Sequence, residues 1–189
     1  TTNPLIASNL AVRIANDPGG TFSNAGLVQG SGTINASLVN NGNIEPGQSA
    51  GAIEVSGNLT LSAGSQLTIE LGGTAGDDYD QLIASGTAAL GGSLLVTLID
   101  AGAGLFAPAV GDAFSILSAA GGIASGFSNL TLPDLEGGLS WDIDYLTNSV
   151  VLSVTSGLPG DFNGNGTVDA ADYVIWRKND GTPNSYNEW

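Results

Sequence analysis

The sequence predicts an all-β protein, a β-solenoid closed by antiparallel strands, followed by a small EF-hand-like loop and helix at the C-terminus. Short β-type runs alternate with Gly, Asn-Gly and Gly-Ser turns from about Thr21 onward. One run opens with Gly64-Ser65 and another with Gly92-Ser93, 28 residues later, within a loose repeat of roughly 20 to 28 residues. Before residue 160 the apolar residues lack the 3.6-residue spacing of a helix. These observations favour stacked strands over packed helices.

The chain divides into two parts. We expect a Gly- and Asn-rich β-solenoid with an antiparallel cap over residues 1–156, and a calcium-binding tail over residues 157–189. The body begins with an apolar stretch at residues 10–14, which ends in a turn cluster at residues 16–20. The Gly- and Pro-containing segment at residues 155–160 then links the body to the calcium loop.

Two runs in the body predict which side chains face the core. Residues 65–71 alternate between polar and apolar types, so Leu67, Ile69 and Leu71 share one face of a strand. Residues 93–99 are apolar on both faces, which is typical of a strand that is covered on two sides. We therefore expect an aspartate at Leu67 or at Leu95 to be destabilising by several kcal/mol.

The middle of the body has a residue composition and repeat pattern similar to those of some secreted proteins. Residues 42–61, continued by residues 79–86 and 91–94, resemble the Gly/Asn-rich strand repeats of autotransporter-like passenger domains. Those domains form right-handed parallel β-helices. The resemblance therefore implies a right-handed parallel β-helix for this body.

The last part of the body predicts an antiparallel hairpin. Trp141, Ile143 and Tyr145 alternate with polar residues, and after a four-residue turn the alternation resumes in the apolar residues Val150, Leu152 and Val154. One face of this hairpin, including its aromatic side chains, should lie in the core. We expect the hairpin to cap the solenoid, because an open end would expose unpaired strand edges.

Composition restricts the function. The chain has 18 acidic and 3 basic residues, a net charge of −15, and no Cys, His or Met. Nucleic acids and anionic membranes attract Lys/Arg clusters, so neither is an expected partner, and no apolar run reaches the ~18 residues of a membrane span. A saline, calcium-rich extracellular setting would screen the repulsion among the acids. Because the first residues lack signal-peptide features, we expect a mature form or a fragment of a secreted protein.

Residues 161–172 have the spacing of a calcium loop. Such a loop takes ligands from positions 1, 3, 5, 7, 9 and 12, with Gly at position 6. Position 6 is Gly166, and position 12 holds Asp where Glu is usual, one methylene shorter. The predicted ligands of a Ca²⁺ ion are Asp161, Asn163, Asn165, the backbone carbonyl of Thr167, Asp169 and Asp172.

Residues 160–173 resemble the calcium-binding repeat of type I dockerins, which also carry Asp at the last loop position. The segment is most similar to dockerin-like C-terminal tails of large secreted and surface proteins of planctomycete-type bacteria. A complete dockerin has two loop–helix halves. Here Ser185, Tyr186 and Trp189 echo the first helix without a second set of ligands, so the resemblance implies half a dockerin.

A helix should follow the loop, from about residue 170 to residue 178. Asp169 is placed to cap its N-terminus, and Asp172 completes a capping-box-like pattern. Arg177 and Lys178 fall in the last turn, where cations are favoured, and Tyr173 and Trp176 share one face.

Two other acidic groups are candidates for chemistry. Asp142 and Asp144 project from one strand face about 7 Å apart, a separation that an inverting glycosidase could use, although such pairs are usually solvated charge. The run at residues 77–80 could hold a second cation or be an ordinary loop. Without His or Cys, and with Arg13 as the only cation in the body, we do not expect an enzyme.

The sequence thus predicts a non-catalytic, calcium-binding structural or assembly protein, secreted or on a cell surface. Its expected partner is itself, as a homo-oligomer or filament, or another surface protein. One alternative is an adhesin or carbohydrate-binding module, which would need Trp141 and Tyr145 to be exposed. The other is the remnant of a β-helix carbohydrate-active enzyme.

Overall fold

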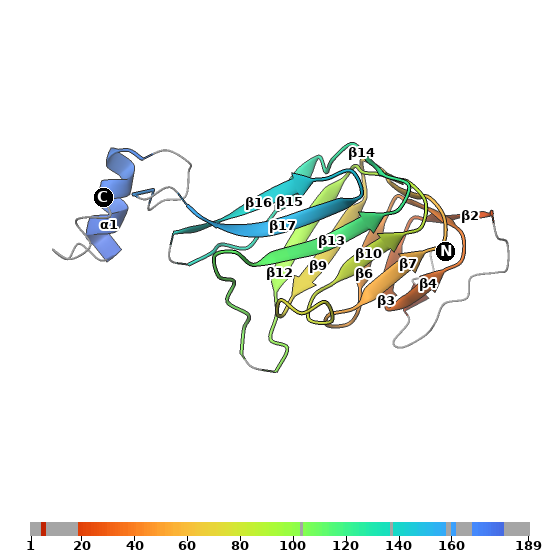
Figure 1. Ribbon diagram of the computed structural model, residues 1–189, viewed down its shortest axis with the longest axis horizontal. Coiled ribbons are helices and arrows are strands. Elements are labelled where there is room, and N and C mark those ends of the chain that lie inside the picture. The colour runs from red at the N-terminus through yellow and green to blue at the C-terminus, as the bar shows by residue number, and fades with distance from the viewer. Residues whose placement is uncertain are drawn as a thin grey trace.

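The computed structural model describes residues 5–6, 19–102, 104–136, 138–157, 160–161 and 168–179 (Figure 1). Its body is all-β, as predicted, and its sheets are mainly parallel. The described strands form three sheets.

The first sheet has the order β1-β3-β6-β9-β12-β15, with β1 Leu5–Ile6, β3 Leu27–Gly30, β6 Asn43–Pro46, β9 Gln66–Leu71, β12 Ser93–Leu98 and β15 Asn129–Thr131. The second has the order β16-β17-β13-β10-β7-β4, with β16 Leu139–Tyr145, β17 Ser149–Ser156, β13 Ala113–Ala119, β10 Gln81–Ala84, β7 Ala52–Val55 and β4 Gly32–Ile34. The third has the order β14-β11-β8-β5-β2, with β14 Ile123–Ala124, β11 Ala88–Ala89, β8 Leu59–Leu61, β5 Ser37–Asn40 and β2 Thr21–Asn24.

Consecutive strands belong to different sheets in a fixed rotation. From β2 to β15, each strand pairs in parallel with the strand three elements later, as β2 does with β5, β3 with β6 and β4 with β7. Parallel neighbours need a long crossover connection, and here the two intervening strands supply it. The chain therefore visits the third, first and second sheets in turn.

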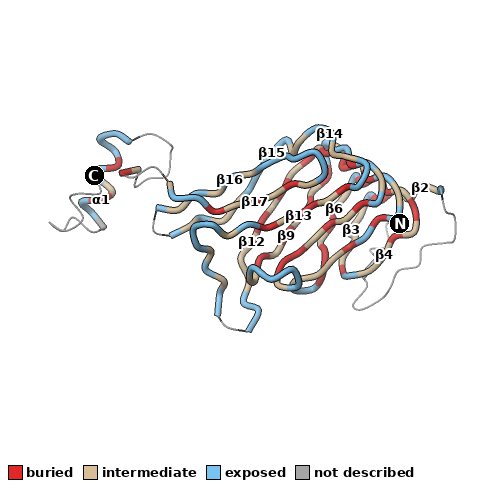
Figure 2. Tube along the Cα trace, in the orientation of Figure 1, coloured by how far each residue is buried: buried red, intermediate tan, exposed pale blue. Residues whose placement is uncertain are grey.

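The core is built from side chains that stack in register along each sheet. In the first sheet, Ile44, Leu67 and Leu94 are register partners, and each is fully buried. Strand β9 alternates as predicted, with Leu67, Ile69 and Leu71 all at 0% exposure. Figure 2 shows buried segments recurring along the strands of the body. Such close stacking makes the interior continuous from one strand to the next.

The turn that follows each of the first two strands of the third sheet is held by stacked asparagines. The Asn24 Nδ2 donates to the Asn40 Oδ1 over 2.6 Å, and the Asn40 Nδ2 donates to the Gly42 carbonyl oxygen over 2.8 Å. Both side chains are buried, so these bonds satisfy groups that water cannot reach. A Cβ on Gly42 would overlap the Gly26 carbonyl oxygen, which explains glycine at this turn.

The repeat lengthens along the chain. Register partners in the third sheet, from Phe22 through Leu38, Leu59 and Ala88 to Ile123, lie 16, 21, 29 and 35 residues apart. The expected repeat of roughly 20 to 28 residues therefore describes only the middle of the body. Most of the added residues lie between the first and second sheets, in the connections from β9 to β10 and from β12 to β13.

Strand β12 is buried on one face only, which corrects the expectation of a strand covered on both sides. Leu94 and Val96 are buried, whereas Leu95 is half-buried and has Thr68 and Thr131 as its register partners. In the sequence, the apolar Leu95 suggests that the outer face of β12 also lies in a core. Among the described residues, however, no further layer covers that face.

The predicted hairpin is confirmed, because β16 and β17 pair in antiparallel fashion and β17 also pairs with β13. The hairpin extends the second sheet, while the first and third sheets end at β15 and β14, and the described residues show no closure of the body. Trp141 and Ile143 are half-buried against the core, but Tyr145 is 40% exposed. The expectation of a buried aromatic face therefore holds for Trp141 and not for Tyr145.

The tail contains α1, Ala170–Asn179, close to the predicted range of 170–178. Asp172 lies in its first turn and Arg177 and Lys178 in its last, as the helix dipole favours. Of the helices in the described part of the chain, none has the length and apolar character needed to cross a membrane.

Candidate calcium loop and other candidate sites

The structure describes three of the six predicted calcium ligands. Asp161 follows the linker in the sequence, and Asp169 and Asp172 lie at the start of α1. Asn163, Asn165 and Thr167 lie outside the described residues. The convergence of all six oxygens on one point therefore stays a prediction.

Asp169 and Asp172 form the predicted reciprocal cap. The Asp169 Oδ1 accepts a hydrogen bond from the Ala171 backbone N–H at 2.7 Å. The Asp172 Oδ2 accepts one from the Asp169 backbone N–H, also at 2.7 Å, and the Asp172 N–H donates to the Asp169 carbonyl oxygen at 3.2 Å. Two backbone donors at the positive end of the helix are thus satisfied by carboxylates. This geometry fixes positions 9 and 12 of the loop relative to each other.

The aromatic face of α1 is also as predicted. The rings of Tyr173 and Trp176 lie 5.5 Å apart between centroids, and Trp176 is buried. Asp172 is buried as well. A buried carboxylate has little water around it, so a cation that it ligated would be bound in a partly desolvated setting.

The chemistry of the loop suits a hard cation. Ca²⁺ takes six to eight oxygen ligands from carboxylates, amides and backbone carbonyls, which are the groups at the six predicted positions. Within the described ranges no three His, Cys, Asp or Glu side chains are grouped as a metal site. Three of the six loop ligands fall outside those ranges.

The acidic run at residues 77–80 is split by the fold. Asp80 is 1% exposed, and its two carboxylate oxygens accept hydrogen bonds from the Gly51 N–H at 2.8 Å and the Glu70 N–H at 2.9 Å. Asp77 is exposed and Asp78 is half-buried. Asp80 therefore joins the first sheet to the segment leading into the second, and this use of its oxygens disfavours a shared cation site with Asp77 and Asp78.

The environment of Asp80 is unfavourable to its charge. Burial raises the pKa of Asp80 to about 8, and the nearby charges of Glu70 and Glu45 act in the same direction, while the two backbone donors oppose the shift. Burial, followed by the charge of Glu45, also raises the pKa of Glu70. The local sequence predicts a loop at Asp80, whereas its buried position depends on contacts with residues 10 and 29 positions away.

The two hairpin carboxylates lie where alternation places them. Asp142 and Asp144 are both exposed on β16, and their register partners on β17 are Ser153 and Val151. Such carboxylates on the wet face of an edge strand fit solvated charge, which also discourages edge-to-edge pairing.

The hairpin aromatics use their polar atoms internally. The Trp141 Nε1–H donates to the Pro133 carbonyl oxygen at 2.9 Å, and its ring lies 6.1 Å from that of Phe114. The Tyr145 hydroxyl oxygen accepts a hydrogen bond from the Phe127 backbone N–H at 3.2 Å. These contacts disfavour the use of the two side chains as a free platform for a sugar.

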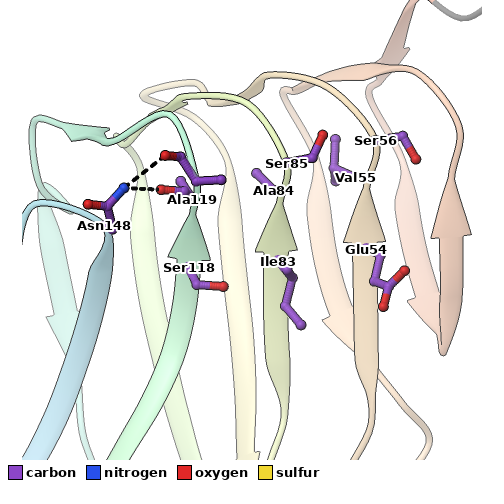
Figure 3. Close-up of a pocket in the computed structure, with 10 residues that line it drawn as sticks. Glu54, Val55, Ser56, Ile83, Ala84, Ser85, Ser118, Ala119 and Asn148 are labelled. Atoms are coloured by element: carbon purple, nitrogen blue, oxygen red, sulfur yellow. Dashed lines mark hydrogen bonds between the residues drawn. The ribbon is translucent and has the colours of Figure 1, made fainter.

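A groove on the second sheet was not expected from the sequence. It has a volume of about 390 Å³ and lies where β7, β10 and β13 end (Figure 3). The Asn148 Nδ2 closes one side by donating to the carbonyl oxygens of Ala119 at 2.8 Å and Ala120 at 3.0 Å. The lining residues are mostly small or apolar: Glu54, Val55, Ser56, Ile83, Ala84, Ser85, Ser118, Ala119, Ala120 and Asn148.

The chain matches no protein-family model, and no curated protein is similar to it. The function is therefore argued from the residues and their geometry.

Proposed function

We propose that this chain is a non-catalytic structural or assembly protein, secreted or on a cell surface, whose C-terminal loop binds Ca²⁺. The observation that carries the proposal is the reciprocal cap of Asp169 and Asp172, which holds loop positions 9 and 12 at the N-terminus of α1. The full ligand set is Asp161, Asn163, Asn165, the Thr167 carbonyl, Asp169 and Asp172. The spacing of these residues matches a calcium loop throughout.

We infer that the body is a right-handed parallel β-helix. The supporting observation is the rotation of strands among three sheets, with each strand pairing with the third one after it. Crossovers between parallel strands of one sheet are right-handed in nearly all proteins, which favours that hand here. A body of this kind is elongated and repetitive, and its role is to present surfaces and to stack.

The proposed structural role, and assembly with other copies or with another surface protein, are supported by the environments of the acidic side chains, the residue composition and the net charge. The buried acid Asp80 is engaged by backbone donors, and the hairpin pair Asp142 and Asp144 is exposed. The chain contains no His or Cys for acid–base or nucleophilic catalysis. A net charge of −15 suits an extracellular medium rich in salt and divalent cations.

Titration calorimetry with Ca²⁺ tests the calcium site. We expect one ion to bind with a dissociation constant of about 10⁻⁵ to 10⁻³ M, because the last ligand is the shorter Asp. Asp161→Ala should abolish the binding heat. Asp142→Ala removes the same charge from an exposed strand position and should leave binding unchanged. Absence of binding, or equal binding by both variants, would refute the calcium site.

A further inference from the structure

The connection from β12 to β13 projects an uncharged, apolar tip. Its described residues are 99–102 and 104–112, and they extend away from the sheets at the bottom of Figure 1. Leu105 is 69% exposed and Val110 is 60% exposed, and residues 101–111 carry no charge. Apolar side chains that are exposed together on one projecting segment can form a contact surface.

Hydrogen bonds at its two ends hold this loop in shape. The Asp100 Oδ1 accepts from the N–H groups of Gly102 at 2.7 Å and Gly104 at 2.9 Å. The Asp112 Oδ2 accepts from the Ala109 N–H at 2.8 Å. Between them the Phe106 ring packs edge-on against Phe114, at 5.9 Å between centroids. A loop ordered in this way gives up little conformational freedom when it binds.

The groove and the loop lie at opposite ends of one strand. The loop enters β13 at Ala113, whereas Ser118 and Ala119 at the other end of β13 line the groove (Figure 3). Seven residues of extended strand span about 20 Å. The loop of one copy therefore lies too far from its own groove to fill it, but a second copy displaced along the strand direction can bring the two together.

Charge favours such a contact between copies. Two chains of net charge −15 repel each other, so they associate best through surfaces with few charges. The loop tip has none. Of the described residues that line the groove, Glu54 alone is charged, and its Oε2 accepts a hydrogen bond from the Thr33 hydroxyl.

We propose that the apolar loop tip at residues 104–111 of one copy docks into the groove of the next. The inference rests on the assembly role proposed above and names the surfaces that carry it. The contact joins different surfaces of identical chains, so it does not close on itself, and repetition gives an open row of molecules along the strand direction. Salt strengthens the association, because it screens the repulsion between the acidic bodies.

Cross-linking tests the contact directly, because the natural chain has no cysteine. Ala107→Cys lies in the exposed loop and Ser85→Cys at the exposed edge of the groove. Mixed and oxidised, these two variants should form a mixed disulfide dimer, identified by mass spectrometry of the linked peptides. The control mixture pairs Ala107→Cys with Ser140→Cys, an exposed position outside the groove, and should give only background. Equal yields from the two mixtures would overturn the proposal.

Sedimentation measurements over a series of protein concentrations give a second test. Leu105→Ser combined with Val110→Ser should weaken association about tenfold or more, because both exposed apolar side chains leave the contact. The matched control is Val174→Ser on α1, where Val174 is 62% exposed, and it should associate as the natural chain does. A natural chain that is monomeric throughout, or a double variant that associates equally well, would overturn the proposal. Neither result would bear on the calcium site in the tail, which the calcium titration tests separately.

Discussion

At the scale of single residues, two leucines on the paired strands β9 and β12 look alike in the sequence but have opposite environments. Leu67 is fully buried in the column of the first sheet, whereas Leu95 faces outward between Thr68 and Thr131. We expect Leu67→Asp to lose several kcal/mol of unfolding free energy, because it buries an unpaired charge, and Leu95→Asp to lose about 1 kcal/mol or less. Chemical denaturation of both variants measures this. Similar losses would show that β12 is covered on its outer face after all.

Asp80 makes the stability of the body depend on pH. Its folded pKa is raised to about 8 from an ordinary value of 3.8, so the folded state binds a proton that the unfolded state has released between these values. The stabilisation is therefore complete below about pH 4 and is lost as the pH rises through about 8. Urea unfolding midpoints of the natural chain should fall between pH 5 and pH 8.5.

Asp80→Asn should reduce that fall, since its amide does not titrate. Asp142→Asn, at an exposed position, serves as the control for general charge effects and should keep the natural dependence. Glu70 and Glu45 lie near Asp80, and the raised pKa of Glu70 acts in the same direction, so a residual slope is expected in Asp80→Asn. An unchanged slope would mean that Asp80 is ionised throughout this range.

At the scale of elements, α1 depends on its cap. Asp169→Ala removes the acceptor for the Ala171 N–H, and such a loss costs about 0.5–2 kcal/mol in helix stability. We expect faster amide hydrogen exchange across residues 170–179 and no change in the β body. Asp169→Ser keeps a capping oxygen while removing a carboxylate from loop position 9.

Comparison of Asp169→Ala with Asp169→Ser separates the effect of helix capping from the effect of calcium binding. Asp169→Ser should retain the slow exchange of α1 but bind Ca²⁺ more weakly, because position 9 loses its negative charge. Chelation of calcium from the natural chain should likewise speed exchange in residues 160–189 and leave the body protected. If neither the Asp169 variants nor calcium chelation changed the amide exchange rate in α1, this coupling would be contradicted.

At the scale of the whole molecule, stability should vary along the stack of strands. Register columns are fully buried in the middle, as at Leu38, Ile44 and Leu67, but the column of the first sheet ends on Leu130, which is 43% exposed. In stacked architectures each unit is stabilised mainly by its neighbours. Amide exchange should therefore be slowest in β6, β7, β9 and β10 and fastest in β14 and β15. Uniform protection would show that the end strands are covered in solution.

The sequence by itself determined the features that depend on neighbours within a few residues. The period-two alternation of Leu67, Ile69 and Leu71 predicted β9, and a similar alternation predicted the hairpin. The spacing of three between Asp169 and Asp172 predicted the cap, because capping bonds join residues within one helical turn.

Only the tertiary structure decided the features that depend on residues far apart in the chain. Register partners lie 16 to 35 residues apart in the third sheet, and this lengthening repeat hides the exact stacking from sequence periodicity. Burial of Asp80 requires donors from Gly51 and Glu70, and the outward direction of Leu95 requires that no layer covers β12. The groove likewise exists only where three strands, about 30 residues apart along the chain, end side by side. Local sequence patterns do not encode these distances, because the free energy that sets them comes from packing between strands far apart in the chain.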